Sequence, residues 1–225
     1  PMHQCRGFQK GPMVMHAHDY LAAARVPATI RPQRRGLWRI RRVRYVAPYL
    51  IDQIGYRSQT RLERWTLGTL HQRRGVLVMD DSRTELSRHL PIWLHAWGRV
   101  LVTGLGLGCV VRGLLANPKV EHIDVVEIDR HILAMVGPEF APQERVTLHY
   151  ADALTFPLPT GLTWDYAWHD LFCEEEHLQI LHARVLFRYQ DVCRHQGAWG
   201  FPRCFKRTWP FSLLGAPRRL YEREA

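Results

Sequence analysis

The fold is decided by one stretch, residues 100–129, which reads VLVTGLGLGCVVRGLLANPKVEHIDVVEID. It opens on a short apolar run, which is followed by three glycines at alternate positions: Gly104, Gly106 and Gly108. An apolar-faced segment from Cys109 to Ala116 comes next, and a second apolar run ends on Glu127. This order predicts a buried strand, a glycine turn, a helix and a second buried strand.

The turn and the acid together have the chemistry of a nucleotide site. Glycine has no Cβ, so a ligand can approach the backbone of the turn closely. The helix that follows directs unpaired N–H groups at that ligand, and Glu127 is placed to accept hydrogen bonds from two ribose hydroxyls. We therefore expect nucleotide binding, with a glycine-rich turn of purely structural purpose as the alternative.

Two more acids follow predicted strands. Residues 146–150 (VTLHY) precede Asp152, and residues 165–169 (DYAWH) precede Asp170. Parallel strands present their carboxyl ends at one edge of an open sheet, where ligands bind, so these two acids and Glu127 are expected to share a site. The predicted fold class is α/β, a Rossmann-like, doubly wound and mostly parallel sheet preceded by a small antiparallel β region.

Pattern divides the chain into three predicted parts. Residues 1–35 form a basic leader that we expect to be partly disordered, apart from a short helical stretch at 18–25. Residues 36–82 form a small β region and residues 83–225 a Rossmann-like cofactor-binding domain. The β region has predicted strands at 37–46, 65–71 and 75–79. In the larger domain we expect helices at 85–97, 130–136 and 174–194 and a fifth strand at 198–201.

Nearly all of the net charge of +10 lies near the amino end. Residues 1–60 hold eleven of the 31 Lys and Arg residues and two of the 21 Asp and Glu residues, a net +9. The densest run contains Arg31, Arg34, Arg35, Arg39, Arg41, Arg42 and Arg44, with Trp38 and Tyr45 among them. Such a run can hold nucleic-acid phosphates, but no recognisable nucleic-acid module surrounds it, so a solvated strand face is favoured.

The composition indicates a cytoplasmic protein. No apolar run approaches the roughly 18–20 residues that span a bilayer, and no secretory signal is visible. The five cysteines show neither a CxxC pair nor a zinc spacing, which is typical of reduced thiols in a protein without a metal site.

Four motifs together resemble class I S-adenosylmethionine-dependent methyltransferases and, within that superfamily, the spermidine-synthase-like branch. They are VLVTGLGLG (100–108), VVEID (125–129), RVTLHYADAL (145–154) and DYAWHDLF (165–172). The resemblance extends over about residues 76–172 and implies S-adenosylmethionine as the cofactor. By this resemblance the cofactor would be held by Thr103, Gly104, Leu105, Gly106, Gly108, Glu127, Ile128, Asp152 and Ala153. Glu127 would bind the ribose hydroxyls, Asp152 would bind the adenine amino group, and Asp170 or His169 would be the general base.

Departures from the family pattern leave alternatives open. Many of these methyltransferases carry an acid just before the first glycine, where this chain has Thr103. Aminopropyltransferases carry acids at the positions of Leu107 and Cys173, so methyl transfer is favoured over aminopropyl transfer to a polyamine. NAD binding is disfavoured, because Cys109 stands in place of the last glycine of G-x-G-x-x-G. His169 is alternatively a packed core histidine.

The methyl acceptor is not named by the sequence. No Asn-Pro-Pro-aromatic or Asp-Pro-Pro-aromatic run follows the strand at 165–169, so a small-molecule acceptor is expected before a nucleic acid. A nucleic-acid partner bound through the basic amino-terminal segment stays open, as does a homodimer. A non-catalytic nucleic-acid-binding protein on the same fold is a third hypothesis.

Overall fold

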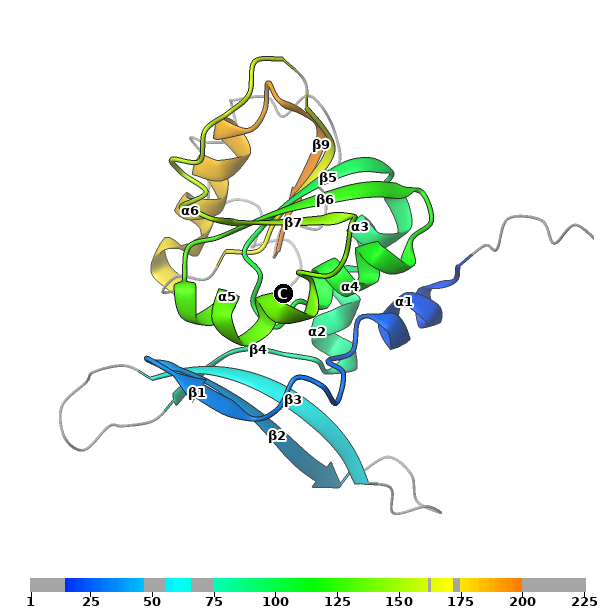
Figure 1. Cartoon of the computed structure of the whole chain (residues 1–225), viewed down its shortest axis with the longest axis vertical. Helices are drawn as coiled ribbons and strands as arrows, with labels where there is room; N and C mark the ends of the chain where they lie inside the picture. Colours follow the sequence, from blue (N-terminus) through cyan, green and yellow to red (C-terminus); the bar gives the residue numbers. More distant parts are fainter. Residues whose placement is uncertain (1–14, 47–55, 66–74, 162, 172–174, 200–225) are drawn as a thin grey trace, which may run out of the picture.

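The computed structural model describes residues 15–46, 56–65, 75–161, 163–171 and 175–199 (Figure 1). Its larger sheet consists of β5 (Gly98–Thr103), β6 (Val120–Glu127), β7 (Val146–Tyr150), β8 (Trp164–His169) and β9 (Cys193–Ala198). The strands lie in the order β7-β6-β5-β8-β9, and every neighbouring pair is parallel. The predicted α/β fold with a doubly wound parallel sheet is confirmed. The strand order reverses beside β5, so the glycine turn begins at the switch point where such sheets bind ligands.

Helices cover both faces of this sheet, which is why its central strands are apolar throughout (Figure 1). α3 (Leu90–His95), α4 (Cys109–Ala116) and α5 (Arg130–Val136) lie on one side, and α6 (Glu175–Arg188) lies on the other. Side chains alternate along a strand, so Val102 packs in the core that includes α4, whereas Leu101 packs with Val185 of α6. No helix in the described ranges is long and apolar enough to cross a membrane.

A separate antiparallel sheet precedes the larger one. It is formed by β1 (Gln33–Arg35), β2 (Trp38–Val46), β3 (Tyr56–Trp65) and β4 (Gly75–Asp80), in that order. Ile40, Leu62 and Met79 from three of its strands join the main core. The Trp38 indole also donates a hydrogen bond of 2.6 Å to Asp129 at the start of α5. Figure 1 shows the result, with the small sheet stacked beneath α5.

The amino-terminal segment is folded where the structure describes it. α1 (Ala17–Ala23) packs against α3 and α4, and Tyr20 and Ala24 are buried in the main core. The short helical stretch expected at 18–25 is thus present as α1, and residues 15–35 are folded; residues 1–14 of the leader, which was expected to be partly disordered, lie outside the described residues. A helix of seven residues is too short to show a sustained period in the sequence. The division of the chain into three parts stays a prediction.

Four elements differ from the prediction. β3 covers Tyr56–Trp65, where no strand was predicted before residue 65; of the strand expected at 65–71, residues 66–71 lie outside the described residues. The helix predicted at 85–97 is two helices, α2 (Arg83–Ser87) and α3, because Pro91 starts a new helix. α6 ends at Arg188, and the fifth strand is Cys193–Ala198, an edge strand whose polar sequence gives little signal.

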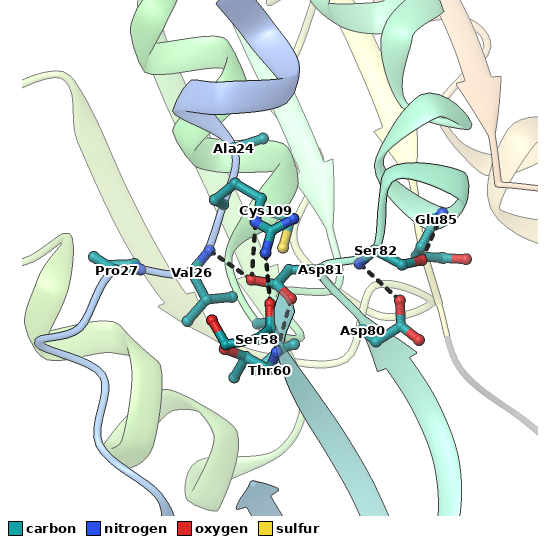
Figure 2. Close-up of polar contacts among 12 residues, drawn as sticks. Ala24, Val26, Pro27, Ser58, Thr60, Asp80, Asp81, Ser82, Glu85 and Cys109 are labelled. Carbon is teal, nitrogen blue, oxygen red and sulfur yellow. Dashed lines mark hydrogen bonds and ion pairs between the residues drawn. The ribbon is translucent and has the colours of Figure 1, made fainter. Parts of the chain in front are cut away.

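A buried carboxylate joins the amino-terminal segment, the small sheet and the larger domain. Asp81 is 2% exposed and accepts hydrogen bonds from the backbone N–H groups of Val26 (3.2 Å) and Thr60 (2.7 Å). Arg25 Nε lies 3.5 Å from the same carboxylate. Figure 2 shows these contacts converging just before α2, whose first turn is capped by Ser82 accepting from the Glu85 N–H. The junction therefore fixes where α2 places Glu85.

Candidate functional site

The glycine turn has a backbone that only glycine adopts without strain. The φ angles of Gly104, Gly106 and Gly108 are 92°, 50° and 78°. A Cβ on Gly104 would lie 2.0 Å from the backbone oxygen of Asp170, and one on Gly106 would lie 2.4 Å from Met79 Sδ. The turn is thus packed between the end of β8 and the small sheet.

Glu127 is bound to this turn. Its Oε2 accepts a hydrogen bond of 2.8 Å from the Leu105 N–H, and its Oε1 accepts one of 2.8 Å from the Asp129 N–H. The side chain is buried, and burial raises the pKa of the carboxyl while the N–H donors oppose that rise. A carboxylate oxygen can accept more than one hydrogen bond, so both oxygens keep capacity for hydroxyl donors.

Asp152 stands one strand further along the same sheet edge. Glu127 pairs with Tyr150 in the ladder between β6 and β7, and Asp152 follows two residues later. Its Oδ1 accepts from the Leu154 N–H at 2.8 Å, and the Tyr189 hydroxyl donates to the Ala153 carbonyl at 2.9 Å. Ile128 is 60% exposed and Tyr150 67% exposed, so apolar surface lies beside the two carboxylates. This arrangement suits a planar base with an amino group and a sugar with two hydroxyls.

Thr103 and His169 are fully buried and bonded to each other. The Gln196 amide donates from Nε2 to the Leu186 carbonyl, so its Oε1 faces His169 Nε2 at 3.1 Å and accepts from it. His169 Nδ1 then accepts the hydrogen bond of the Thr103 hydroxyl at 2.9 Å. Burial lowers the pKa of His169 to about 4, so the ring is neutral near pH 7. Both side chains face the interior of the domain beneath the turn.

Asp170 lies at the mouth of the site. Its backbone N–H donates to the Thr103 carbonyl at 2.8 Å, which holds the end of β8 against the turn, and its side chain is 23% exposed. Burial raises the pKa of Asp170 to about 7, with further contributions from the negative charges of Glu85 and Glu127. A carboxyl with this pKa is suited to exchange a proton at neutral pH.

Two residues near Asp170 were missed by sequence reasoning. Glu85 lies on α2, where the Trp199 indole donates to its Oε1 at 2.9 Å. His89 begins α3, with Nε2 at 3.9 Å from Asp170 Oδ2. The one available signal was their spacing of four residues, which puts two polar side chains on one side of a helical segment.

Arg112 supports the turn from behind. Its guanidinium donates to Glu139 Oε1 at 2.8 Å and Oε2 at 3.1 Å, and to the Leu107 carbonyl at 2.6 Å. It also reaches the Ala24 carbonyl at the end of α1, at 3.4 Å. One buried side chain therefore connects the turn, the 3-10 helix η1 (Gly137–Glu139) and the amino-terminal segment.

Comparison with known proteins gives partial matches. No model of a known protein family matches the chain. A polyamine aminopropyltransferase from Agathobacter rectalis is 32% identical over 124 residues, which cover 50% of this chain and 42% of that protein. The ribosomal RNA small subunit methyltransferase A of Dechloromonas aromatica is 42% identical over 102 residues, which cover 41% of this chain and 39% of that protein. The chain thus spans about two fifths of the length of the curated relatives it matches.

Among solved structures, the 23S rRNA methyltransferase ErmE aligns with 52% of this chain and 45% of its own, at 14% identity and a TM-score of 0.41. The sheet order and the curated matches agree with the resemblance in the four motifs. In its sheet order and its curated matches, the chain resembles the class I S-adenosylmethionine-dependent methyltransferase superfamily. Within this superfamily the curated matches divide between two kinds of transferase, so the spermidine-synthase-like branch stays a hypothesis.

Proposed function

We propose that the chain is an S-adenosylmethionine-dependent methyltransferase. The observation that carries the proposal is the set of three carboxylates, Glu127, Asp152 and Asp170, at the ends of β6, β7 and β8 around the glycine turn. The matched stretch of the ribosomal RNA methyltransferase from Dechloromonas aromatica supports it. S-adenosylmethionine supplies a methyl group that its sulfonium already activates, so the protein mainly has to align the acceptor and manage one proton.

The residues fit the adenosine part of this cofactor. Glu127 offers two carboxylate oxygens for the ribose hydroxyls, and Asp152 Oδ2 has no hydrogen bond from the described residues and is available to an amino group. Exposed Ile128 offers an apolar surface to the base. Direct contact of Thr103 with the cofactor stays a prediction, which the burial of its side chain does not favour.

Asp170 is the better candidate for the base. His169 is buried, and both of its ring nitrogens are engaged by Thr103 and Gln196. We therefore assign His169 a positioning role beneath the turn and Asp170 the removal of a proton from the acceptor. This assignment agrees with the alternative prediction that His169 is a packed core histidine.

Aminopropyl transfer is the rival on the same site, and the match to the Agathobacter rectalis protein favours it. Calorimetry separates the two activities, because decarboxylated S-adenosylmethionine is the donor for aminopropyl transfer. We expect S-adenosylmethionine and S-adenosylhomocysteine to bind more tightly than the decarboxylated form, with NAD binding weakest. If the decarboxylated compound binds more tightly, aminopropyl transfer becomes the better proposal. If neither S-adenosylmethionine nor its decarboxylated form binds, both proposed activities are wrong.

The protonation of Asp170 gives a direct test of its environment. In a carbon-13 NMR titration the Asp170 carboxyl, assigned with Asp170→Asn, is expected to titrate near pH 7, above the ordinary range of aspartate. Glu85→Gln removes a negative charge that disfavours ionisation, so the midpoint should fall. Glu121→Gln on β6 is the control, because that side chain is exposed, and it should leave the midpoint unchanged. A midpoint near 4 in the unsubstituted protein contradicts the assignment.

A nucleic acid is the second candidate partner, and the arginine pairs on the small sheet are the observation that favours it. Arg34 stands directly opposite Arg39 in the ladder of β1 and β2, and Arg41 stands opposite Arg61 in the ladder of β2 and β3. Like charges in such pairs destabilise a sheet, and among the described residues the Glu63 carboxylate forms one ion pair, with Arg41 at 3.3 Å. A chain of phosphates on this face would relieve the repulsion. The names of the methyltransferase relatives refer to ribosomal RNA and give the expected small-molecule acceptor no support.

Charge removal on this face tests RNA binding. With a fluorescent single-stranded 20-mer RNA, Arg34→Gln/Arg39→Gln is expected to weaken binding and to lower the salt slope by about 0.7 for each arginine. Arg184→Gln/Arg194→Gln removes the same charge from exposed positions on α6 and β9, which lie away from the small sheet in Figure 1, and should have little effect. Equal losses in the two double variants would show attraction to net charge alone and would dismiss the sheet as a binding surface.

A further inference from the structure

His89 is a fully buried side chain whose ring nitrogens have no hydrogen-bond partner among the described residues. Its ring lies 5.7 Å from that of Trp93 and 5.9 Å from that of Trp168, between centroids. Burial lowers the pKa of His89 to about 3, so the neutral ring offers one donor and one acceptor nitrogen. Such orphaned groups are rare in native proteins, and strain, a catalytic role or a bound water or ion accounts for them.

The unsatisfied ring faces the site already described. His89 Nε2 lies 3.9 Å from Asp170 Oδ2, which is too long for a hydrogen bond. A single nitrogen at about 2.9 Å from each atom would bridge them. Glu85 lies near Asp170 as a second carboxylate, and its Oε2 is paired with Arg88 at 2.9 Å. The helix α2, the residue before α3 and the end of β8 thus bring hydrogen-bond acceptors together.

We propose that His89, Asp170 and Glu85 form the acceptor side of the site and bind an amino nitrogen of the methyl acceptor. One N–H donates to Asp170 Oδ2 and another to the unprotonated nitrogen of His89, while Glu85 favours an acceptor that carries positive charge on a group other than this neutral nitrogen. Two hydrogen bonds fix the direction of the nitrogen lone pair. The inference rests on the proposed methyl transfer and adds the class of acceptor and two residues that hold it.

The chemistry balances with the groups present and the proposed donor. The lone pair of the neutral amino nitrogen forms the bond to the methyl carbon, and the carbon–sulfur bond breaks with its electron pair passing to sulfur. The positive charge passes from sulfur to nitrogen. The nitrogen then gives one proton to the Asp170 carboxylate, and the methylated amine leaves neutral.

Two buried histidines allow a matched test of His89. His89→Leu replaces an unpartnered ring with an apolar side chain of similar size, so the melting temperature should stay the same or rise by about 2–4 °C. His169→Leu removes the partner of Thr103 and Gln196 and should lower the melting temperature by several degrees. A comparable fall in both variants would show that His89 is structural and would overturn the proposal.

Binding completes the test with two amino compounds as probes. 1,4-Diaminobutane and adenosine are titrated into the full chain saturated with S-adenosylhomocysteine. Whichever probe binds, His89→Leu is expected to lower the affinity for it by about tenfold. The affinity for S-adenosylhomocysteine should stay within twofold. Glu85→Gln should weaken the diamine more than adenosine, because only the diamine is charged.

The outcomes separate this inference from the proposed function. If the protein binds S-adenosylhomocysteine but neither probe, or binds a probe equally well in His89→Leu, the acceptor site is wrong and the methyltransferase proposal stands. If S-adenosylhomocysteine does not bind, the proposed function fails. The probes are then titrated alone, and a loss of probe binding in His89→Leu still supports an amine site.

Discussion

Glu127→Gln is expected to weaken binding of S-adenosylhomocysteine by about 100-fold. Two hydroxyl hydrogen bonds to a charged carboxylate contribute about 1.5–3 kcal/mol each, and the neutral amide keeps only part of that. The amide keeps one oxygen, so its NH2 group also lies against one of the two backbone N–H groups, of Leu105 or of Asp129, that donate to the carboxylate at 2.8 Å. The turn would therefore lose an anchor at the same time as the ligand loses its acceptor. Isothermal titration calorimetry measures the change.

Glu121→Gln is the matched control for this variant. Glu121 lies on the same strand, β6, with an exposed side chain, so the substitution changes the net charge equally. Its S-adenosylhomocysteine affinity should stay within twofold of the unsubstituted protein. Suppose that the Glu127→Gln protein keeps its melting temperature and binds S-adenosylhomocysteine as tightly as the Glu121→Gln control. Glu127 then does not bind the ribose hydroxyls, and the ribose does not lie beside it.

The sequence predicted the larger sheet because its centre is unambiguous. Val100 to Val102 and Val125 to Val126 are apolar in succession, which occurs where helices cover both faces of a strand. The predicted position of the edge strand β9 was wrong, because this strand has one neighbour and a polar sequence that gives little signal. Gln196 on β9 accepts a hydrogen bond from His169, which is a tertiary contact that no local sequence pattern reveals.

The site was predictable to the extent that strand ends determine it. Glu127 ends β6, Asp152 comes two residues after β7 and Asp170 comes directly after β8, so the sheet alone brings them to one edge. Thr103 also ends a strand, yet its side chain points inward to His169, a choice made by the alternation of the strand. Glu85 and His89 reach the site because α2 and α3 pack across its mouth, which depends on the junction at Asp81, shown in Figure 2.

Arg112→Met is expected to destabilise the protein by about 3–5 kcal/mol, which lowers the melting temperature by roughly 10 °C in a chain of this size. The Arg112 side chain is 8% exposed and that of Glu139 is 21% exposed, so solvent screens their ion pair weakly. Methionine keeps the length of the stem but leaves the Glu139 carboxylate and the Leu107 carbonyl without their donor. Because Leu107 belongs to the glycine turn, the affinity for S-adenosylhomocysteine should also fall.

Two further variants make the reason for this loss measurable. Arg194→Met breaks an ion pair with Asp165 of 3.3 Å whose arginine is 54% exposed, and it should lower the melting temperature by no more than about 2–3 °C. Glu139→Gln combined with Arg112→Met removes the stranded charge and should recover part of the lost stability. If the double variant recovers stability but not ligand affinity, the affinity depends on the bond from Arg112 to the Leu107 carbonyl. Equal small losses in Arg112→Met and Arg194→Met would show that the buried pair does not hold the turn.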